Sequence, residues 1–433
     1  MKIVSKLKKE NGFDFEAFEF FTRSEVLKSG ANILERFIEE MVKKFSNTRV
    51  ICTCGETMRN IGKRTKRIKT VLGEIKYCRP FYRCNKCGRY LFNVDRILGL
   101  TKTGCSPGAQ KLISHAGSRE SYKEASDDLA LYSNLKITQK EVERITKKIG
   151  FEVEEWLQKE ATVIQVTDAY GKQELEESGY IDTLYISFDG TGVPMRLSEM
   201  KGVKGKQEDG SAKTREVKLG CIFTQTKPDE KGNPQRDPYS TSYVGKIENS
   251  QEFGDRIYRE SLRRGLRKSR RIVCITDGAQ YNKSIISQYF PNSIHIIDIY
   301  HSKEKIYNLS KILLKENDGE LKKWLKLLEK GSIDKMIIRI KENLPRSGLK
   351  RKGAISLLNY FEQNKKQMKY RKYKKQNLFV GSGVVEAGCK TVIGKRLKNS
   401  GMFWSKEGAN AVIALRCVLY SGRFEEFWES KTA

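Results

Sequence analysis

The stretch "VCITDGAQYN", residues 273–282, decides the fold prediction, because an apolar strand-forming run stops there at Asp277 and a glycine. A second run, "LYISFDGTGVP" at residues 184–194, stops in the same way at Asp189. Short runs of branched and aromatic residues bounded by turn residues predict buried β-strands. In one sheet, these strand ends would bring two like charges together, which is costly unless a cation lies between them. The two runs therefore predict a metal site at the end of a sheet.

The alternative interpretation of Asp277 is a helix cap. An aspartate at a helix start accepts hydrogen bonds from free backbone N–H groups, and a helix is predicted to start near Ala279. A metal site explains both acids at once, since Mg²⁺ favours one or two carboxylates together with phosphate oxygens. A pair of such ions can activate water and stabilise the leaving 3′ oxygen during phosphodiester cleavage. We therefore expect two Mg²⁺ or Mn²⁺ ions as cofactors, with nuclease or strand-transfer chemistry.

Two metal sites require a third acid, and Glu386 is the candidate. It lies in "GVVEAGC", a segment of small and apolar residues that follows a glycine-serine turn and predicts a helix packed closely on the sheet. Lys390 follows one helical turn later, and Arg396 lies further along. The alternative is a surface glutamate paired with the lysine four residues on.

Composition points to a polyanionic partner. The chain has 433 residues, with 83 Lys and Arg against 53 Asp and Glu, and a formal net charge of +30. A positive field of this strength attracts DNA or RNA, although a basic protein that is merely soluble is the alternative. No apolar run is long enough to span a membrane, and the first residues lack a secretory signal pattern. We therefore expect a cytoplasmic protein, whose ten cysteines are thiols or metal ligands.

Five of the cysteines lie between residues 52 and 87. Two tight turns each offer two of them, and zinc takes four such ligands in tetrahedral geometry. The predicted ligands of a structural Zn²⁺ are Cys52, Cys54, Cys84 and Cys87, within a small zinc ribbon. Cys78 is an alternative to one of the first pair. Unligated buried thiols are the alternative to any metal, since cysteine packs as a small hydrophobe.

Three basic segments are predicted to contact double-stranded DNA. The first has six basic residues in eleven, between the cysteine turns, and the second is a helix-turn-helix candidate whose second helix begins near Gln139. The third, residues 344–377, has eleven basic residues against one acid. Ordinary solvated helix surfaces are the alternative for the second and third. The predicted DNA-binding residues are Arg59, Lys63, Arg64, Lys66, Arg67, Lys69, Lys140, Arg144, Lys147, Lys369, Arg371, Lys372, Lys374 and Trp404.

Aromatic residues are candidates for stacking on exposed bases. Tyr360, Tyr370 and Tyr373 lie among the basic residues of the third segment. Trp404 and Trp324 are candidates for stacking on a distorted terminal base, and core packing is the alternative for both.

The order of predicted elements gives the fold class. Three adjacent strands are followed by helices that alternate with two more strands, which is typical of a mixed α/β sheet. Two helices are predicted over residues 14–45. The predicted domains are an N-terminal helical segment (1–48), a zinc ribbon (49–100), a helix-turn-helix-like segment (101–170), an α/β core (180–309), a basic helical segment (310–378) and C-terminal helices with the third acid (379–433).

Three segments carry a family resemblance: "YISFDGTGVPM" (185–195), residues 273–306 and residues 381–416. They resemble the catalytic blocks of bacterial insertion-sequence DDE transposases, in particular the Kra-type family and more distantly the Mutator-like group. The likeness extends upstream through "YRCNKCG" and "FNVDRILGL" and covers most of the chain beyond about residue 50. The block around Glu386, with "SGMFWS" behind it, is its most specific part.

The resemblance implies an RNase H-like catalytic core, with Asp189 on the first strand, Asp277 on the fourth and Glu386 on a late helix. It implies that the helical segment 310–378 is an insertion between the second and third acids. "DIYH" matches an Asp-x-x-His element of such families, so Asp298 and His301 are implied to support the site or the DNA, with capping or core packing as the alternative for His301.

The implied reaction is metal-dependent cleavage at the element ends followed by strand transfer into target DNA. It would take place at the nucleoid of a bacterial cell, in a homodimer or a larger assembly on DNA. Two other functions remain open. A zinc-containing DNA-binding regulator would need none of the three acids, and an RNase H-like nuclease would use them without transposing.

Overall fold

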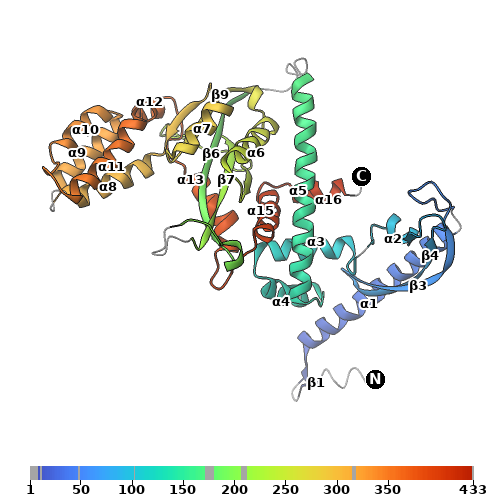
Figure 1. Ribbon diagram of the computed structural model, residues 1–433. Helices are drawn as coiled ribbons and strands as arrows, with labels where there is room; N and C mark the ends of the chain where they lie inside the picture. The colour runs from blue at the N-terminus through green and yellow to red at the C-terminus, as the bar shows by residue number, and fades with distance from the viewer. Residues whose placement is uncertain are drawn as a thin grey trace. The chain divides into compact units, whose positions relative to one another are not determined.

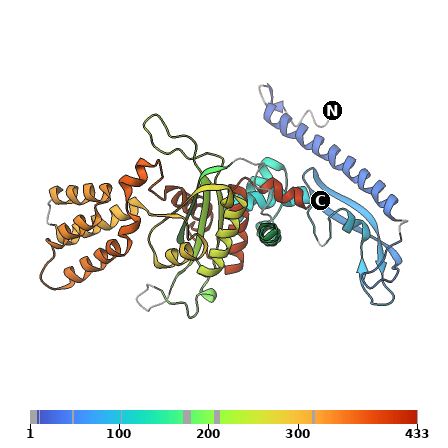
Figure 2. The same cartoon turned by 90° about the horizontal axis from the view of Figure 1, so that it is seen from above.

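The structure is a computed structural model that describes residues 8–9, 12–46, 49–101, 103–170, 180–205, 212–314 and 318–431. The chain divides into two compact units, residues 1–149 and 150–433 (Figures 1 and 2). The boundary falls inside one long helix. The finer division into six domains stays a prediction.

The first unit contains a long helix, a three-stranded antiparallel sheet and several shorter helices. Its elements are β1 (Lys8–Lys9), β2 (Gly12–Phe13), α1 (Phe15–Ser46), β3 (Arg59–Thr70), β4 (Gly73–Arg83), β5 (Tyr90–Leu91), α2 (Asn93–Ile97), α3 (Pro107–Arg119), α4 (Tyr122–Ser133) and the start of α5 (Gln139–Tyr170).

Helix α1 corrects the prediction of two helices over residues 14–45. It runs unbroken from Phe15 to Ser46 and contains Gly30 in its interior. A Cβ at that glycine would lie 3.4 Å from Leu72 Cδ1, so the helix passes close to the turn between β3 and β4. Ala31, Ile38 and Val42 are buried in a core shared with these strands. This packing outweighs the low helix propensity of a single glycine.

A buried ion network joins α2 to the sheet of the first unit. Asp95 is only 4% exposed and accepts hydrogen bonds from Tyr77 Oη at 2.7 Å and Arg79 Nε at 3.0 Å. Lys66 Nζ lies 3.1 Å from its other oxygen. A buried carboxylate needs such partners to remain charged.

The second unit is a mixed α/β fold with a helical extension. Its elements after α5 are β6 (Ile181–Pro194), β7 (Thr214–Thr224), β8 (Ser242–Lys246), α6 (Ser250–Arg263), β9 (Ser269–Thr276), α7 (Gln280–Tyr289), β10 (Ile294–Ile297), α8 (Ile299–Leu313), α9 (Asp318–Lys330), α10 (Ile333–Lys341), α11 (Leu349–Asn364), α12 (Tyr370–Lys375), α13 (Gly383–Gly388), a π-helical turn (Cys389–Gly394), α14 (Lys395–Leu397), α15 (Lys406–Tyr420) and α16 (Phe424–Ser430).

Five strands form one sheet in the order β10-β9-β6-β7-β8. The first strand in the chain, β6, lies at the centre, antiparallel to β7 and parallel to β9. β8 is antiparallel to β7, and β10 is parallel to β9. The prediction of a mixed α/β sheet is therefore confirmed, and the helices that follow β8 and β9 supply the crossovers that parallel strands need.

The two faces of the sheet pack against different helices (Figure 1). Leu184, Ile186 and Phe188 of β6 share a core with residues of α6 and α7. Tyr185 belongs to a second core, on the other face, with Val385 of α13 and the apolar residues of α8 to α12. Because side chains alternate along a strand, Asp189 has the parity of Tyr185 and lies on the α13 face.

Candidate active site and metal centre

Asp189 lies in β6 on the face that α13 covers. Its Oδ1 accepts a hydrogen bond of 2.7 Å from the N–H of Gly190. The thiol of Cys389, at the start of the π-helical turn, is 4.0 Å from Oδ2. The side chain is partly buried, so its charge is only partly screened by water.

Asp277 follows the last residue of β9 and has the parity of Val273 and Ile275, which belong to the α13 side of the core. Its Oδ1 accepts hydrogen bonds from Ala279 N at 2.9 Å and from Asn282 Nδ2 at 2.7 Å. The aspartate thus braces the turn before α7, but it is not the helix cap of the alternative interpretation, because the N-cap residue is Ala279 and no side chain caps the helix. Only one of its two oxygens is used for this purpose.

Glu386 lies in α13, which packs against β6 and β7. The close approach depends on Gly388, because a Cβ there would lie 2.7 Å from the ring of Tyr243 on β8. The hydroxyl of Ser382, the residue before the helix, is 3.2 Å from Glu386 Oε1. Lys390 is exposed, and the described part of the chain shows no ion pair between it and Glu386.

Asp277 and Glu386 both act electrostatically on Asp189. Burial raises the pKa of Asp189, and the charges of Asp277 and Glu386 raise it further. The N–H of Gly190 and the imidazole of His301 oppose this rise in pKa. The structure therefore places Asp277, Glu386 and His301 within electrostatic reach of Asp189, although the segments that carry them lie far apart in the sequence.

The acids approach one another without forming a closed set of ligands. In the described residues, a cluster of three or more ligand atoms within 4.8 Å of one another is found at four cysteines and not at these carboxylates. Asp277 and Glu386 each have one oxygen engaged by a neighbour, and the described residues donate no hydrogen bond to Asp277 Oδ2 or Glu386 Oε2. At Asp189 the second oxygen meets only the weak thiol donor of Cys389. Hard divalent cations take such carboxylate oxygens together with water and phosphate oxygens. The residues present fit this chemistry.

Asp298 and His301 lie beside the acids. Asp298 is fully buried at the start of α8, and its Oδ1 accepts a hydrogen bond of 2.8 Å from Tyr300 N. Its Oδ2 accepts a hydrogen bond from the Ser382 hydroxyl, which also approaches Glu386. The sequence analysis did not predict a role for Ser382. Its position immediately before the helix that carries Glu386 could have indicated one. Asp298 and Ser382 thus link the end of β10 to Glu386.

Arg396 and Trp404 form a buried pair, which contradicts the prediction that Trp404 contacts DNA. Arg396 is 1% exposed, and its guanidinium lies 5.0 Å from the centre of the Trp404 ring. Trp404 is 6% exposed, and its Nε1 donates to Leu397 O at 3.1 Å. Its backbone N–H donates to Pro194 O, so the segment holds the end of β6. The neighbouring Phe403 is 63% exposed and is the aromatic side chain that this segment presents to solvent.

The four predicted cysteine ligands of zinc come together in the first unit. The sulfur atoms of Cys52, Cys54, Cys84 and Cys87 all lie within 4.8 Å of one another. Two of the separations are 3.5 Å, between Cys52 and Cys87, and 3.6 Å, between Cys54 and Cys84. A tetrahedral Zn²⁺ with bonds of about 2.3 Å holds its sulfurs about 3.8 Å apart. The cluster can bind a metal such as zinc.

The local backbone supports metal binding at this cluster. A hydrogen bond from the N–H of Cys54 lowers the pKa of Cys52 to about 6, and the N–H of Cys87 lowers the pKa of Cys84. A lower pKa favours the thiolate, which is the form that binds metal. Cys78 is exposed on β4 opposite Thr65 and lies outside the cluster.

The basic residues of β3 divide into exposed and internal groups. Arg59, Lys63, Arg64 and Arg67 are exposed on the strand. Lys66 is bonded to Asp95, and Lys69 Nζ donates to Lys136 O at 2.8 Å. Lys66 and Lys69 therefore stabilise the fold, so fewer basic side chains of β3 are available to DNA than the sequence suggests.

Helices α4 and α5 follow one another in the chain, and α5 begins at Gln139 as expected. The helix-turn-helix assignment of this pair stays a prediction. Thr138 Oγ1 accepts a hydrogen bond of 3.3 Å from Glu141 N at the start of α5. Lys140 is exposed. Arg144 and Lys147 form ion pairs with Glu141 and Glu143 on the same helix, which reduces the net positive charge of this face.

The basic residues of the third segment line an open hollow of about 360 Å³ beside β10. Lys366, Lys369 and Lys372 line it, together with His295 and Tyr373. Burial lowers the pKa of His295 to about 4, so the histidine adds no charge at neutral pH. Arg371 and Lys374 are exposed nearby on α12.

The tyrosines of this segment contradict the prediction of base stacking. Tyr370 and Tyr373 are 0% and 6% exposed and belong to the core of the helical region. Tyr360 is partly buried, and its hydroxyl donates to Asp277 O at 3.0 Å. Trp324 is fully buried in the same core. These rings stabilise the helices, and Tyr360 also braces the turn that carries Asp277.

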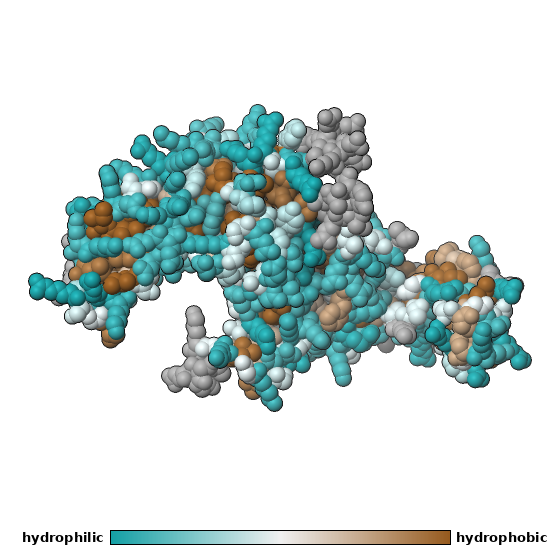
Figure 3. Space-filling model, turned by 45° about the horizontal axis from the view of Figure 1, so that its top comes forward, coloured by the Kyte–Doolittle hydropathy of each residue, from teal (hydrophilic) through white to brown (hydrophobic). Residues whose placement is uncertain are grey.

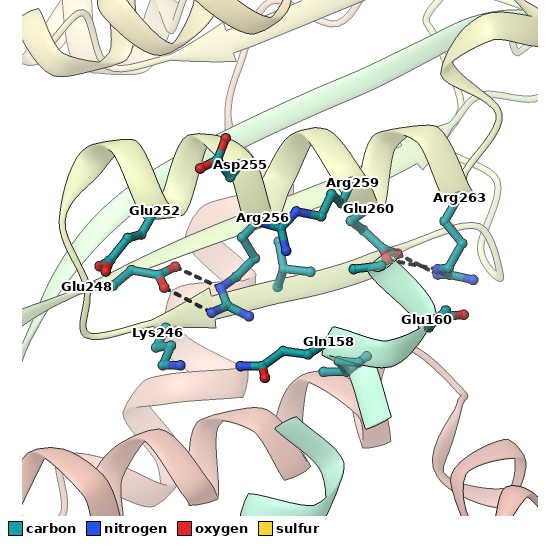
Figure 4. A pocket seen from close by; sticks show the side chains of 13 residues that line it. Gln158, Glu160, Lys246, Glu248, Glu252, Asp255, Arg256, Arg259, Glu260 and Arg263 are labelled. Carbon is teal, nitrogen blue, oxygen red and sulfur yellow. Dashed lines mark hydrogen bonds and ion pairs between the residues drawn. The ribbon is translucent and has the colours of Figure 1, made fainter. Parts of the chain in front are cut away.

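A second hollow, of about 300 Å³, lies beside α6 and contains none of the predicted catalytic residues (Figure 4). Arg256 forms a paired contact with Glu248 and reaches Glu154, while Arg263 pairs with Glu260. Opposite charges are matched within this network, so we assign it the structural role of joining α5, β8 and α6.

The face drawn in Figure 3 is mostly hydrophilic, with apolar side chains in separate patches. None of the described helices is long and apolar enough to cross a membrane.

Comparisons with known proteins give related chains without an established activity. A family model described as "Uncharacterised protein family (UPF0236)" matches residues 8–203. A UPF0236 protein of Caldanaerobacter subterraneus subsp. tengcongensis is 25% identical over 448 aligned positions, which cover 95% of this chain and 83% of the relative. The name of that relative joins eleven separate designations.

A solved structure titled "Drosophila P element transposase strand transfer complex" aligns with 78% of this chain and 84% of its own, at 10% identity and a TM-score of 0.24. At this TM-score the likeness carries no argument about fold or function.

Proposed function

We propose that the protein is a metal-dependent DNA transposase of the insertion-sequence type. The observation that carries the proposal is the meeting of Asp189, Asp277 and Glu386 on one face of a mixed sheet. Each comes from a different part of the chain, and each has an oxygen that accepts no hydrogen bond from nitrogen or a hydroxyl in the described residues. Acids that served only as caps or surface charges would not need to lie within electrostatic reach of one another.

The sheet supports an RNase H-like assignment of the second unit. Its first strand is central, runs antiparallel to the second and parallel to the fourth, and the fifth lies beyond the fourth. The sequence resemblance to DDE transposases implies this core. It places the acids on the first strand, after the fourth strand and on a late helix. Helices α9 to α12 would then be the insertion between the second and third acids.

The residues of the site have separate roles in the proposed reaction. Divalent metal ions, when bound, supply Lewis-acid activation of the attacking and leaving oxygens. Asp189, Asp277 and Glu386 would hold them, while Ser382 and Asp298 position Glu386. The chain itself orients the phosphodiester for in-line attack and needs no nucleophilic side chain. The first attack, by water, frees a 3′ hydroxyl, and the second joins that hydroxyl to target DNA.

Charge and copy number support DNA as the substrate. The net charge of +30 gives the chain a strong attraction for phosphates. The exposed residues of β3 and the lysines around the hollow beside β10 are the surfaces we propose for this contact. The name of one relative joins eleven designations. Repeated copying of a gene within one genome would produce such a set. A regulator that binds DNA would explain the charge but not the acids.

The test is a cleavage and joining assay with the DNA that flanks the gene. Wild-type protein with Mg²⁺ or Mn²⁺ should nick the element end and join it to a second DNA. Asp189→Asn, Asp277→Asn and Glu386→Gln should each lower both rates by at least about a thousandfold, because metal activation contributes several kcal/mol to the transition state. Glu230→Gln, an exposed acid in a turn, is the matched control.

Three outcomes would contradict the proposal or part of it. Cleavage without joining would indicate an RNase H-like nuclease that does not transpose. Binding without cleavage would indicate a DNA-binding regulator. Cleavage that survives all three substitutions would show that these acids are not the site.

A further inference from the structure

Helix α1 carries a stripe of apolar side chains that the described residues do not cover. Phe15, Phe18, Val26, Ile33 and Phe37 are 71%, 52%, 65%, 69% and 60% exposed. At 3.6 residues per turn they lie on one side of the helix, away from the face of Ala31, Ile38 and Val42 that packs on β3 and β4. None of residues 15–30 is buried. Exposed apolar side chains aligned along one side of a helix in this way mark an interaction site.

The stripe has nearly the same spacing in either direction from Val26. Phe15 lies eleven residues before Val26 and Phe37 eleven after it, while Phe18 and Ile33 lie eight before and seven after. An eleven-residue spacing keeps a stripe nearly parallel to the helix axis. From Phe15 to Phe37 it extends about 33 Å at 1.5 Å per residue. A stripe with this symmetry fits a second copy of itself that runs antiparallel, since a two-fold interface is self-complementary.

Charge also favours a second copy over DNA on this face. Helix α1 contains six acidic and five basic residues and is therefore close to neutral, whereas the whole chain carries +30. Two copies of so basic a chain repel each other over most of their surfaces, and a neutral face reduces that repulsion. DNA gains nothing electrostatically from this helix. It gains more from β3, whose six charged side chains are all basic.

We propose that α1 pairs with α1 of a second copy of the chain in an antiparallel, two-fold arrangement centred on Val26. Phe15 of one copy faces Phe37 of the other, and Phe18 faces Ile33. The N-terminal half of α1 in one copy then covers the exposed side of the C-terminal half of α1 in the other copy. The opposite side of each C-terminal half stays packed on β3 and β4 of the same copy. The proposal does not depend on catalysis or on DNA.

The first test is the mass of the DNA-free protein by sedimentation over a concentration series. The wild type should approach twice the chain mass of 49.8 kDa. Phe37→Glu should raise the dimer dissociation constant by more than about tenfold, because a two-fold interface contains the substituted position twice. The matched control is Phe20→Glu, which is 51% exposed on the same helix but outside the stripe. It should change the constant by less than about threefold.

The second test resolves the direction of pairing. Phe15→Lys and Phe37→Glu should each fail to self-associate. An equal mixture should recover the dimer, since the introduced lysine of one variant then faces the introduced glutamate of the other. A parallel pair would not recover, and that result would overturn the antiparallel arrangement.

Circular dichroism and bound zinc of every variant should match the wild type. A wild type that stays monomeric at all concentrations would overturn the proposal. Equal effects of Phe37→Glu and Phe20→Glu would also overturn it. Loss of thermal stability in Phe37→Glu without a change of mass would show that the chain covers the stripe itself.

Discussion

The cysteine cluster of the first unit and the acidic site of the second differ in how far their ligands have come together. Four sulfur atoms lie within 4.8 Å of one another, while the three carboxylates influence one another but do not form such a cluster. The cysteines project from turns of one small module. The acids project from β6, the end of β9 and α13, which are held in place by a much larger core.

Charge explains the difference. A thiol ionises less readily than a carboxylic acid, so four cysteines repel one another less than the same number of carboxylates would before a metal binds. Carboxylates at neutral pH are charged and repel one another, and this repulsion adds to the effect of burial in raising the pKa of Asp189. A closed sulfur site suits a structural ion, and an open acidic site leaves room for water and substrate. The comparison predicts that loss of ligands affects folding at the first site and chemistry at the second.

The largest effect is expected at the cysteines. Cys84→Ser should remove the bound zinc and unfold the module of β3 to β5, because structural zinc sites contribute roughly 10 kcal/mol or more to the folding of small modules. Metal analysis of the purified protein and circular dichroism measure both. Cys78→Ser is the matched control, since Cys78 is exposed outside the cluster. Its zinc content should stay unchanged, and equal loss in both variants would contradict the assignment of ligands.

A smaller effect is expected at the hollow beside β10. Replacing Lys366, Lys369 and Lys372 by Ala should reduce the slope of log affinity against log salt by about 2 to 3, since each phosphate contact contributes about 0.9. Fluorescence anisotropy with a DNA duplex at several salt concentrations measures the slope. The control triple replaces Lys322, Lys326 and Lys330, exposed on α9, with the same loss of charge. An equal change of slope in both triples would show general attraction and no particular contact at the hollow.

The smallest effect is a gain of stability at Asp189. Its pKa is raised in the folded protein, so stability is lost as pH rises from the ordinary carboxyl pKa through the raised one, and the penalty stays constant above it. Asp189→Asn should therefore raise the melting temperature of the metal-free protein by a few degrees at neutral pH and change it little in acid. Thermal unfolding at several pH values, with a chelator present, is the measurement. Saturating Mg²⁺ should stabilise the wild type and narrow the gap. A lower melting temperature for the variant at neutral pH would contradict this account of Asp189.

The sequence was sufficient for features set by local pattern. The apolar run "LYISF" predicted the strand β6 that carries Asp189, and two cysteine turns predicted the metal cluster. The order of strands and helices predicted a mixed sheet. These features depend on short apolar runs and on ligand spacing, which neighbouring residues determine.

Features that depend on tertiary packing could not be predicted from the sequence. Tyr370 and Tyr373 lie among lysines and arginines, yet both are buried, because only the fold shows which side of α12 meets the core. Trp404 is buried for the same reason, while its neighbour Phe403 is exposed. Lys66 is held by Asp95, an acid twenty-nine residues away. Composition alone could not separate such internal cations from those that face solvent.

The central claim is that three acids far apart in the sequence bind divalent metal together. The direct measurement is a titration of the DNA-free protein with Mn²⁺, in which electron paramagnetic resonance detects the bound ion. Zn²⁺ is kept in the cysteine cluster during the titration. We predict saturable binding that Asp189→Asn, Asp277→Asn and Glu386→Gln each weaken, while Glu230→Gln leaves it unchanged. Binding that none of the three substitutions alters would contradict the claim.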